Sequence, residues 1–264
     1  MSDYIFYYEG IEGTTITLLN MTADTDYPTS NMQDRNIHTY FTDSSFSQNT
    51  VAIGVDFGSG VTRDADHIVL KHKITGVAAT GTVQYSDNGS DWTSTDYSGE
   101  ALTENTTITE LWSFTAESAH RYWRMVWQDL GDPLTALQVF NVILGDKYTW
   151  NHNPELALKT SRGYEVENSE GAGGYRYSRI RNTNPRRKWE LDYKYIDSTE
   201  QAKLEAWADV IGCNVNNGKP SRYPFYFSND GGTTLYYVRA LGPLVFDQMA
   251  YDAFQTKIIL EEEL

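Results

Sequence analysis

Cysteine is almost absent from this chain, which has 264 residues and a single thiol, Cys213. One thiol can form neither an internal disulfide nor a cysteine-based zinc site. Long hydrophobic runs are also missing, and no stretch approaches the roughly 20 apolar residues of a membrane-spanning helix. We therefore expect no membrane insertion. The first residues lack a basic stretch followed by an apolar run, so no secretion signal is predicted. If the protein acts outside cells, we expect it to leave by another route, such as host lysis.

Basic residues are few, with 21 Lys and Arg against 36 Asp and Glu and a net charge of −15. This balance argues against nucleic acid as a partner, because a phosphate backbone attracts basic surfaces. The charge is also uneven. Residues 1–150 hold 20 acidic and 7 basic residues, whereas residues 151–264 hold 16 and 14. Two halves of such different charge indicate two domains.

Catalytic motifs are missing as well. The five histidines do not form a His-Glu-x-x-His pair, and neither a Gly-x-Ser-x-Gly elbow nor a phosphate-binding glycine loop is present. No neighbouring sequence activates Cys213 as a nucleophile. The sequence therefore predicts a protein that is not an enzyme and that needs no organic cofactor.

Aromatic residues, in contrast, are abundant at 14%, which favours strands and binding surfaces. In the first half, apolar and polar residues alternate with period two over Val51–Phe57, Arg121–Trp127 and Leu137–Leu144. Asn88-Gly89 lies between strand-like residues and predicts a hairpin turn. Short strands at regular spacing with no convincing helix predict a β-sandwich.

The second half combines strands with one helix. Trp189, Leu191, Tyr193 and Tyr195 alternate with charged residues over 186–196, which predicts a half-buried antiparallel strand. A helix is predicted over about 198–211, with Ser198 as its cap, Gln201 completing a capping box and Gly212 ending it. The expected fold class is mainly β, with a sandwich over 1–147, a linker over 148–158 and an antiparallel β-domain with one packed helix over 159–264.

The first half resembles the discoidin, or coagulation-factor type C, family, which includes many carbohydrate-binding modules. The residues that carry the resemblance, in matching order, are Asn31–Thr39, Val55–Gly58, Gln84–Trp92, Tyr122–Met125 and Val139–Gly145. The resemblance implies a jelly-roll sandwich with binding loops at one end.

This resemblance also implies candidate site residues. In such modules a calcium ion often lies near a segment like Asn31–Thr39, which makes Asp34 and Thr39 candidate ligands because oxygen donors suit calcium. The alternative is that Asp34 only hydrogen-bonds its own loop. Trp92 is expected in the core. The candidates for stacking on a sugar or bonding its hydroxyls are Tyr27, Asn36, His38, Tyr40, Phe41, Asp43 and Tyr97, and loop packing is the alternative for each.

The second half resembles the minor tail protein M family of lambda-like phages and related distal tail proteins. The carrying features are an Arg-x-Trp-x-Leu strand at Arg187–Leu191, the short helix, the strand Tyr223–Phe227, the Gly231-Gly232 turn and the last strand ending in Glu261–Glu263. The resemblance implies a structural protein of a phage tail tip or baseplate that is made in the host cytoplasm and located in the virion. Its expected partners are other tail proteins and copies of itself, in a ring of three or six, and a host glycan for the sandwich.

A basic run without acids follows the predicted linker, and its members are Arg176, Arg179, Arg181, Arg186, Arg187 and Lys188. We interpret the run as a subunit interface that meets an acidic surface, because acidic residues are plentiful elsewhere in the chain. A nucleic-acid patch and a solvated face are the alternatives.

A different reading of the whole chain is a bacterial carbohydrate-binding protein or module without catalytic activity, in which the second half is a further binding module. A glycan hydrolase is a third reading, but the sequence offers it no catalytic constellation.

Overall fold

The structure is a computed structural model of the chain. It describes residues 4–43, 50–75, 79–99, 105–129, 136–145, 147–151, 154, 159–164, 166–170, 176–180, 184–213 and 221–263. No helix among these residues has the length and apolar character needed to cross a bilayer.

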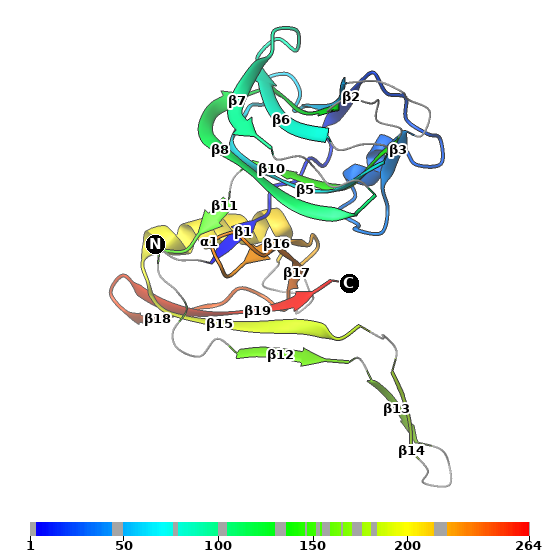
Figure 1. Ribbon diagram of the computed structural model, residues 1–264. Helices are drawn as coiled ribbons and strands as arrows, with labels where there is room; N and C mark the ends of the chain where they lie inside the picture. The colour runs from blue at the N-terminus through cyan, green and yellow to red at the C-terminus, as the bar shows by residue number, and fades with distance from the viewer. Residues whose placement is uncertain are drawn as a thin grey trace. The chain divides into compact units, whose positions relative to one another are not determined.

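The chain forms two compact units (Figure 1). The sandwich unit is Glu9–Lys147, and the helix-sheet unit combines Met1–Tyr8 with Tyr148–Leu264. The predicted sandwich over 1–147 therefore ends where expected, but it begins eight residues later. The first residues belong to the other unit, so the sandwich is an insertion between two parts of that unit.

The sandwich unit is built from two antiparallel sheets. The four-stranded sheet has the order β3 (Phe41–Asp43), β10 (Ala136–Leu144), β5 (Arg63–Thr75) and β8 (Ile108–His120). The five-stranded sheet has the order β2 (Thr15–Leu19), β4 (Thr50–Asp56), β9 (Tyr122–Asp129), β6 (Ala79–Ser86) and β7 (Thr93–Ser98). A short 3-10 helix, η1 (Thr29–Met32), precedes β3. The predicted β-sandwich is confirmed.

Alternation along the strands builds the sandwich core. Val51, Ile53 and Val55 of β4 stand opposite Trp127, Met125 and Trp123 of the neighbouring strand β9, and all six are buried in one hydrophobic cluster. The two ends of the unit are tied together, because the amide of Leu144 donates to the carbonyl of Glu9 at 2.9 Å. The Arg63 side chain donates to the carbonyls of Gly10 and Leu144. An insertion needs such neighbouring ends, since it leaves and re-enters the other unit.

The helix-sheet unit holds an eight-stranded antiparallel sheet. Its order is β11 (Lys147–Thr149), β1 (Ile5–Tyr7), β16 (Phe225–Ser228), β17 (Tyr236–Ala240), β19 (Ala253–Glu262), β15 (Arg186–Ile196) and β12 (Lys159–Gly163), with β18 (Phe246–Ala250) paired to β19. Figure 1 shows the helix α1 (Ser198–Ile211) beside β1 and β16. A separate two-stranded hairpin, β13 (Val166–Glu170) and β14 (Arg176–Ile180), projects from the unit.

The predicted linker over 148–158 needs correction at its start. Tyr148 and Trp150 are buried in the core of the helix-sheet unit, and Tyr148 lies in β11. Their rings contact Phe6 of β1, at 6.1 and 5.8 Å between centroids. Two large aromatic side chains therefore bury apolar area in a segment whose polar neighbours suggested a loop.

The strand β15 follows its predicted alternation up to Tyr193. Trp189, Leu191 and Tyr193 are buried, but the predicted fourth member, Tyr195, is 69% exposed. The ladder with β19 shifts register between Tyr193 and Ile196, and Tyr195 has a φ of 64°. A bulge adds one residue to the strand, so Ile196 takes the inner position instead.

The helix α1 buries the predicted stripe, which contains Leu204, Trp207, Ala208 and Ile211. Gly212 ends it with a φ of 67°, which confirms the predicted C-terminal glycine. The cap is Asp197 rather than Ser198, because the Asp197 carboxylate accepts from the Glu200 amide at 2.7 Å. Both residue types cap helices well, so sequence places the helix start only to within one residue.

Candidate functional site

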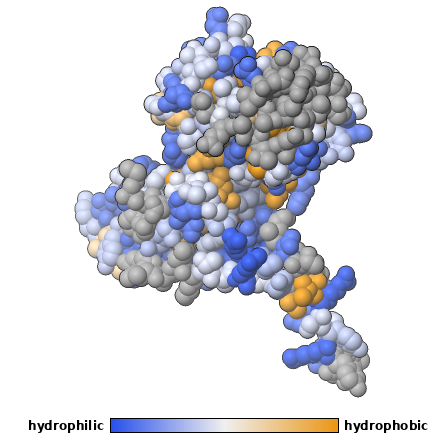
Figure 2. Space-filling view, viewed as in Figure 1, coloured by the Kyte–Doolittle hydropathy of each residue, from blue (hydrophilic) through white to orange (hydrophobic). Residues whose placement is uncertain are grey.

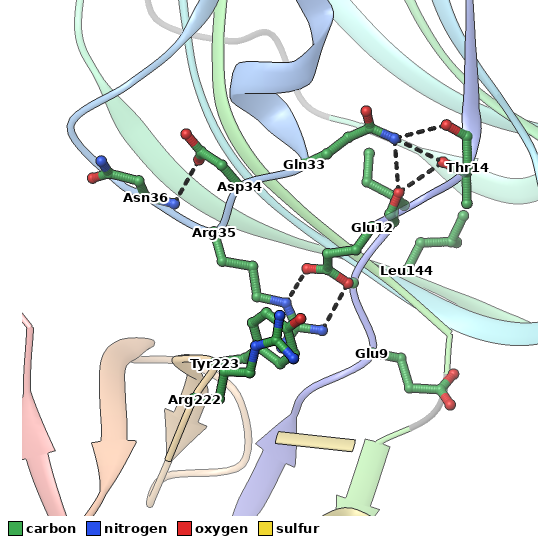
Figure 3. Close-up of polar contacts among 12 residues, drawn as sticks. Glu9, Glu12, Thr14, Gln33, Asp34, Arg35, Asn36, Leu144, Arg222 and Tyr223 are labelled. Carbon is green, nitrogen blue, oxygen red and sulfur yellow. Dashed lines mark hydrogen bonds and ion pairs between the residues drawn. The ribbon is translucent and has the colours of Figure 1, made fainter. Parts of the chain in front are cut away.

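The predicted binding segment of the sandwich unit is a loop held by its own side chains. The Asp34 carboxylate accepts hydrogen bonds from the Asn36 amide and from the Thr39 hydroxyl, each at 2.8 Å. The Asn36 side-chain oxygen accepts from the His38 amide at 3.0 Å. Figure 3 shows the Asp34 contact, beside an ion pair between Glu12 and Arg35. The loop is therefore preformed, with the side chains of Asn36 and His38 at its surface.

These contacts bear on the predicted calcium ligands. Asp34 and Thr39 lie together, as the prediction requires, but the Thr39 hydroxyl donates a hydrogen bond to the Asp34 carboxylate. Calcium takes six to eight oxygen ligands. Among the described residues, no group of three His, Cys, Asp or Glu side chains gathers to hold a metal ion. Side chains alone thus do not complete a calcium site at this loop, and a bound ion stays a prediction.

Two of the predicted aromatic residues form a stacked pair beside this loop. The rings of Tyr27 and Tyr40 lie 4.6 Å apart with an interplanar angle of 11°, and Tyr27 is 38% exposed. Tyr40 also contacts the ring of Phe140, at 5.2 Å. A hydrogen bond with Tyr27 is the main cause that raises the pKa of Tyr40. We call Tyr27, Tyr40 and Phe140 the tyrosine platform.

Lys71 connects the platform to the loop. Its ammonium lies 5.4 Å from the Phe140 ring centroid and donates to the Ile37 carbonyl at 3.4 Å. Burial lowers the pKa of Lys71. The side chain thus fixes the loop against β5 and β10 and adds a positive charge behind the aromatic surface.

Sequence reasoning missed Phe140 because β10 contains an irregularity. The ladder with β5 shifts between Val139 and Asn141, and both of these residues are buried while Phe140 is half-buried. A bulge turns one extra side chain outward. Alternation counted from Leu137 turns Phe140 outward, but alternation counted back from Leu144 turns it inward, so the pattern alone gives two answers.

Two further sugar-binding candidates, Phe41 and Asp43, are buried, which corrects the prediction for them, whereas Tyr97 is half-buried and stays a prediction. Phe41 is fully buried in the sandwich core. Asp43 is 2% exposed and accepts from the Thr22 amide at 2.5 Å. Tyr97 stacks on the buried Trp112 at 5.1 Å between centroids. These side chains contribute to core packing and loop closure in the sandwich unit.

Trp92 was expected in the core, but it is half-buried and does not belong to the core cluster. The Arg124 guanidinium lies over its ring at 4.1 Å from the centroid and donates to the Gln84 side chain at 2.6 Å. Burial lowers the pKa of Arg124. The turn at Asn88-Gly89 therefore places Trp92 under a cation on the five-stranded sheet.

The basic run of the second half is partly paired within its own chain. Arg176 lies 4.0 Å from Glu170, Arg187 lies 3.9 Å from Glu262 and Lys188 lies 3.6 Å from Glu261. Arg179 stands opposite Glu167 in the hairpin ladder, Arg186 lines a cavity described below, and Arg181 lies outside the described residues. The acidic C-terminal residues thus neutralise part of the run, and the predicted interface role stays a prediction.

The single cysteine has a structural environment. The Cys213 thiol donates to the Gly242 carbonyl at 2.9 Å, and burial raises its pKa. A raised pKa keeps the thiol protonated, which makes it a poor nucleophile.

Comparison with protein-family models and with curated proteins finds no match. Similar solved structures include chitosan-binding module 1 of a Paenibacillus chitosanase/glucanase, with 16% identity over 53% of this chain and 100% of that chain at a TM-score of 0.41. A family 32 carbohydrate-binding module from C. perfringens in complex with galactose has 14% identity over 55% and 99%, also at 0.41. A module in complex with 4,5-unsaturated mannuronic acid has 19% identity over 52% and 95%, at 0.38. At these values the likeness assigns no ligand to this chain.

Proposed function

We propose that this protein binds glycans without catalysing a reaction, through the tyrosine platform and the adjoining loop of the sandwich unit. The observation that carries the proposal is the stacked and partly exposed pair of Tyr27 and Tyr40. Stacking on Tyr40 holds the exposed ring of Tyr27 in a fixed orientation. A sugar can therefore pack its apolar face on the Tyr27 ring at a small cost in side-chain entropy.

The preformed loop supplies the polar half of the surface. Asn36 and His38 belong to a segment that is already ordered by the Asp34 contacts. Ordered amide and imidazole groups beside an aromatic ring suit sugar hydroxyls, which need hydrogen bonds in fixed directions. The role of His38 and Asn36 as hydroxyl ligands is part of the proposal.

The test is a glycan array screen of the full chain, followed by calorimetric titration of the strongest ligand. We expect Tyr40→Ala to weaken binding about ten-fold or more, because it removes the ring that supports Tyr27. Tyr40→Phe keeps the ring and is expected to retain most of the affinity. Tyr195→Ala, which removes a 69% exposed ring from the other unit, is the matched control. Wild-type affinity in Tyr40→Ala would exclude the platform, and a wild-type chain that binds no glycan would exclude the function.

A second candidate function, structural assembly in a phage tail tip or baseplate, is favoured by the projecting hairpin. Every residue of β13 and β14 is exposed, and Val166 pairs with Ile180 across the ladder. Val166, Tyr177 and Ile180 are 46%, 66% and 55% exposed. Figure 2 shows the apolar surface on this hairpin. An isolated two-stranded hairpin is marginally stable in water, so these side chains favour packing on a second copy.

For this second function we expect the wild-type chain to form a ring of three or six copies, by light scattering and negative-stain imaging, alone or with tail-tube protein. Ile180→Ser is expected to reduce the assembly to monomers, because it replaces one member of the exposed apolar pair Val166–Ile180 with a polar side chain that cannot bury apolar area against a second copy. Leu19→Ser, at a 43% exposed position of the sandwich unit, is the control. A wild-type monomer that also ignores tail-tube protein would contradict this function and leave glycan binding unaffected.

A further inference from the structure

A cavity of about 510 Å³ lies in the helix-sheet unit, whereas the tyrosine platform belongs to the sandwich unit. It lies where the edge strand β12 pairs with β15, and Gly163 stands opposite Arg186 while Ser161 stands opposite Lys188. Residues directly opposite in a ladder share one face of the sheet. Trp189 alternates to the other face, where it is buried in the core. The cavity is therefore on the face that the aromatic core does not cover.

Positive charge dominates this cavity. Arg162, Arg186 and Lys188 line it, against the single carboxylate of Glu261, which lies 3.6 Å from Lys188. Neither arginine makes an ion pair with a residue that the structure describes. The Nε atom of Arg186 is buried without a hydrogen-bond partner. A buried donor without a partner costs free energy. An anionic ligand that accepts from Arg186 would remove this cost.

The rim has the features of a sugar site rather than of a site for a bare ion. The Tyr164 ring is 54% exposed and lines the cavity. Ser161 contributes a hydroxyl, and no heavy atom lies within 4 Å of the position that a Cβ of Gly163 would take. An aromatic ring, a hydroxyl and open space beside Arg186 match a pyranose ring that carries a carboxylate. The volume is also in the range of small-ligand sites.

We propose that this cavity binds an acidic sugar, with the carboxylate of a uronic acid held by Arg186 and the ring packed on Tyr164. The proposal is independent of the platform, because it concerns the other unit and a charged ligand. It gives Arg186, a member of the basic run, a ligand that neutralises it.

The experiment is calorimetric titration of the full chain with trigalacturonic acid. The matched probe is the same trisaccharide with each carboxyl reduced to a hydroxymethyl group. We expect binding of the acidic trisaccharide only, weakened by raising NaCl from about 50 to 500 mM because charge pairing is screened. Arg186→Gln is expected to weaken binding about ten-fold or more. Tyr164→Ala, outside the core, is expected to weaken it several-fold.

Arg187→Gln is the matched control. Arg187 neighbours Arg186 in the sequence, but it pairs with Glu262 and lies over the Tyr236 ring on the opposite face of the strand. Its substitution removes the same charge and is expected to change affinity by less than about two-fold. Unchanged circular dichroism of Arg186→Gln would show that a loss of binding is not a loss of folding, since its side chain does not enter the core.

Three results would overturn the proposal. Equal affinity of Arg186→Gln and wild type would exclude the cavity. Equal competition by sodium acetate or sulfate would show an ion site without a sugar subsite. Arg186-dependent binding of a Glu-rich peptide, with none of the trisaccharide, would assign the cavity to a protein partner instead. Tyr40→Ala is expected to leave trigalacturonate binding intact, so failure of the platform and failure of this cavity give different results.

Discussion

Replacing Phe6 by alanine is expected to lower the free energy of unfolding of the helix-sheet unit by about 3–5 kcal/mol. Phe6 lies in β1, only six residues from the N-terminus, yet it is fully buried. Removing a large ring from a close-packed core leaves a cavity that the neighbours fill only in part.

The size of this effect follows from the position of the ring. Phe6 contacts five aromatic side chains with centroid separations of 4.9 to 6.1 Å, which are Tyr148, Trp150, Trp207, Phe225 and Phe227. They come from β11, the chain just after it, α1 and β16. The strand β1 also pairs with β16 through Ile5, Phe6 and Tyr7. Phe6 thus connects the N-terminal segment to residues more than 140 positions away.

The measurement is thermal unfolding monitored by differential scanning calorimetry, in which each unit is assigned its own unfolding transition. Phe6→Ala is expected to lower the melting temperature of the helix-sheet unit and to leave the sandwich transition in place. Phe41→Ala is the reciprocal control, because Phe41 is fully buried in the sandwich core. A Phe6→Ala variant that lowers only the sandwich transition would contradict the assignment of residues 1–8 to the helix-sheet unit.

The second large effect concerns Glu200, for which Glu200→Ala is expected to cost about 2–3 kcal/mol. Glu200 lies in the first turn of α1 and is 3% exposed. Its carboxylate accepts from the Tyr148 hydroxyl at 3.0 Å and from the Asn151 amide at 3.2 Å. Alanine would leave the buried hydroxyl without this acceptor. It would also remove a negative charge from the helix N-terminus, where such a charge is favourable.

Urea unfolding of the helix-sheet unit measures this cost. Glu200→Gln keeps an acceptor oxygen for Tyr148, so we expect a smaller loss than with alanine. Glu205→Ala, an exposed position of the same helix, is expected to change stability by less than about 0.5 kcal/mol. Burial, followed by the nearby Glu200 charge, raises the pKa of Tyr148. Equal stability of Glu200→Ala and Glu205→Ala would show that the Tyr148 contact contributes little.

The sequence identified only some of the residues that form the candidate binding surface. Loop composition and the family resemblance pointed to Tyr27, Tyr40 and the 34–39 loop, because polar turn residues and exposed aromatics have a local signature. Phe41 and Asp43 share that signature but face the core, since their orientation depends on how β3 joins β10. Only the pairing of β3 with β10 in the folded structure separates the surface residues from the buried Phe41 and Asp43.

The sequence by itself determined the local elements of this protein. Period-two alternation indicated β4, β9 and β15, and the apolar stripe with its terminal glycine indicated α1, because these patterns depend on neighbours a few residues apart. The tertiary structure decided which strands pair, that β1 (Ile5–Tyr7) completes a sheet whose other strands all come after residue 146, and where bulges interrupt the alternation at Phe140 and Tyr195. Alternation states which side chains share a face, but it does not name the neighbouring strand. Pairing depends instead on packing between residues that are far apart in the chain.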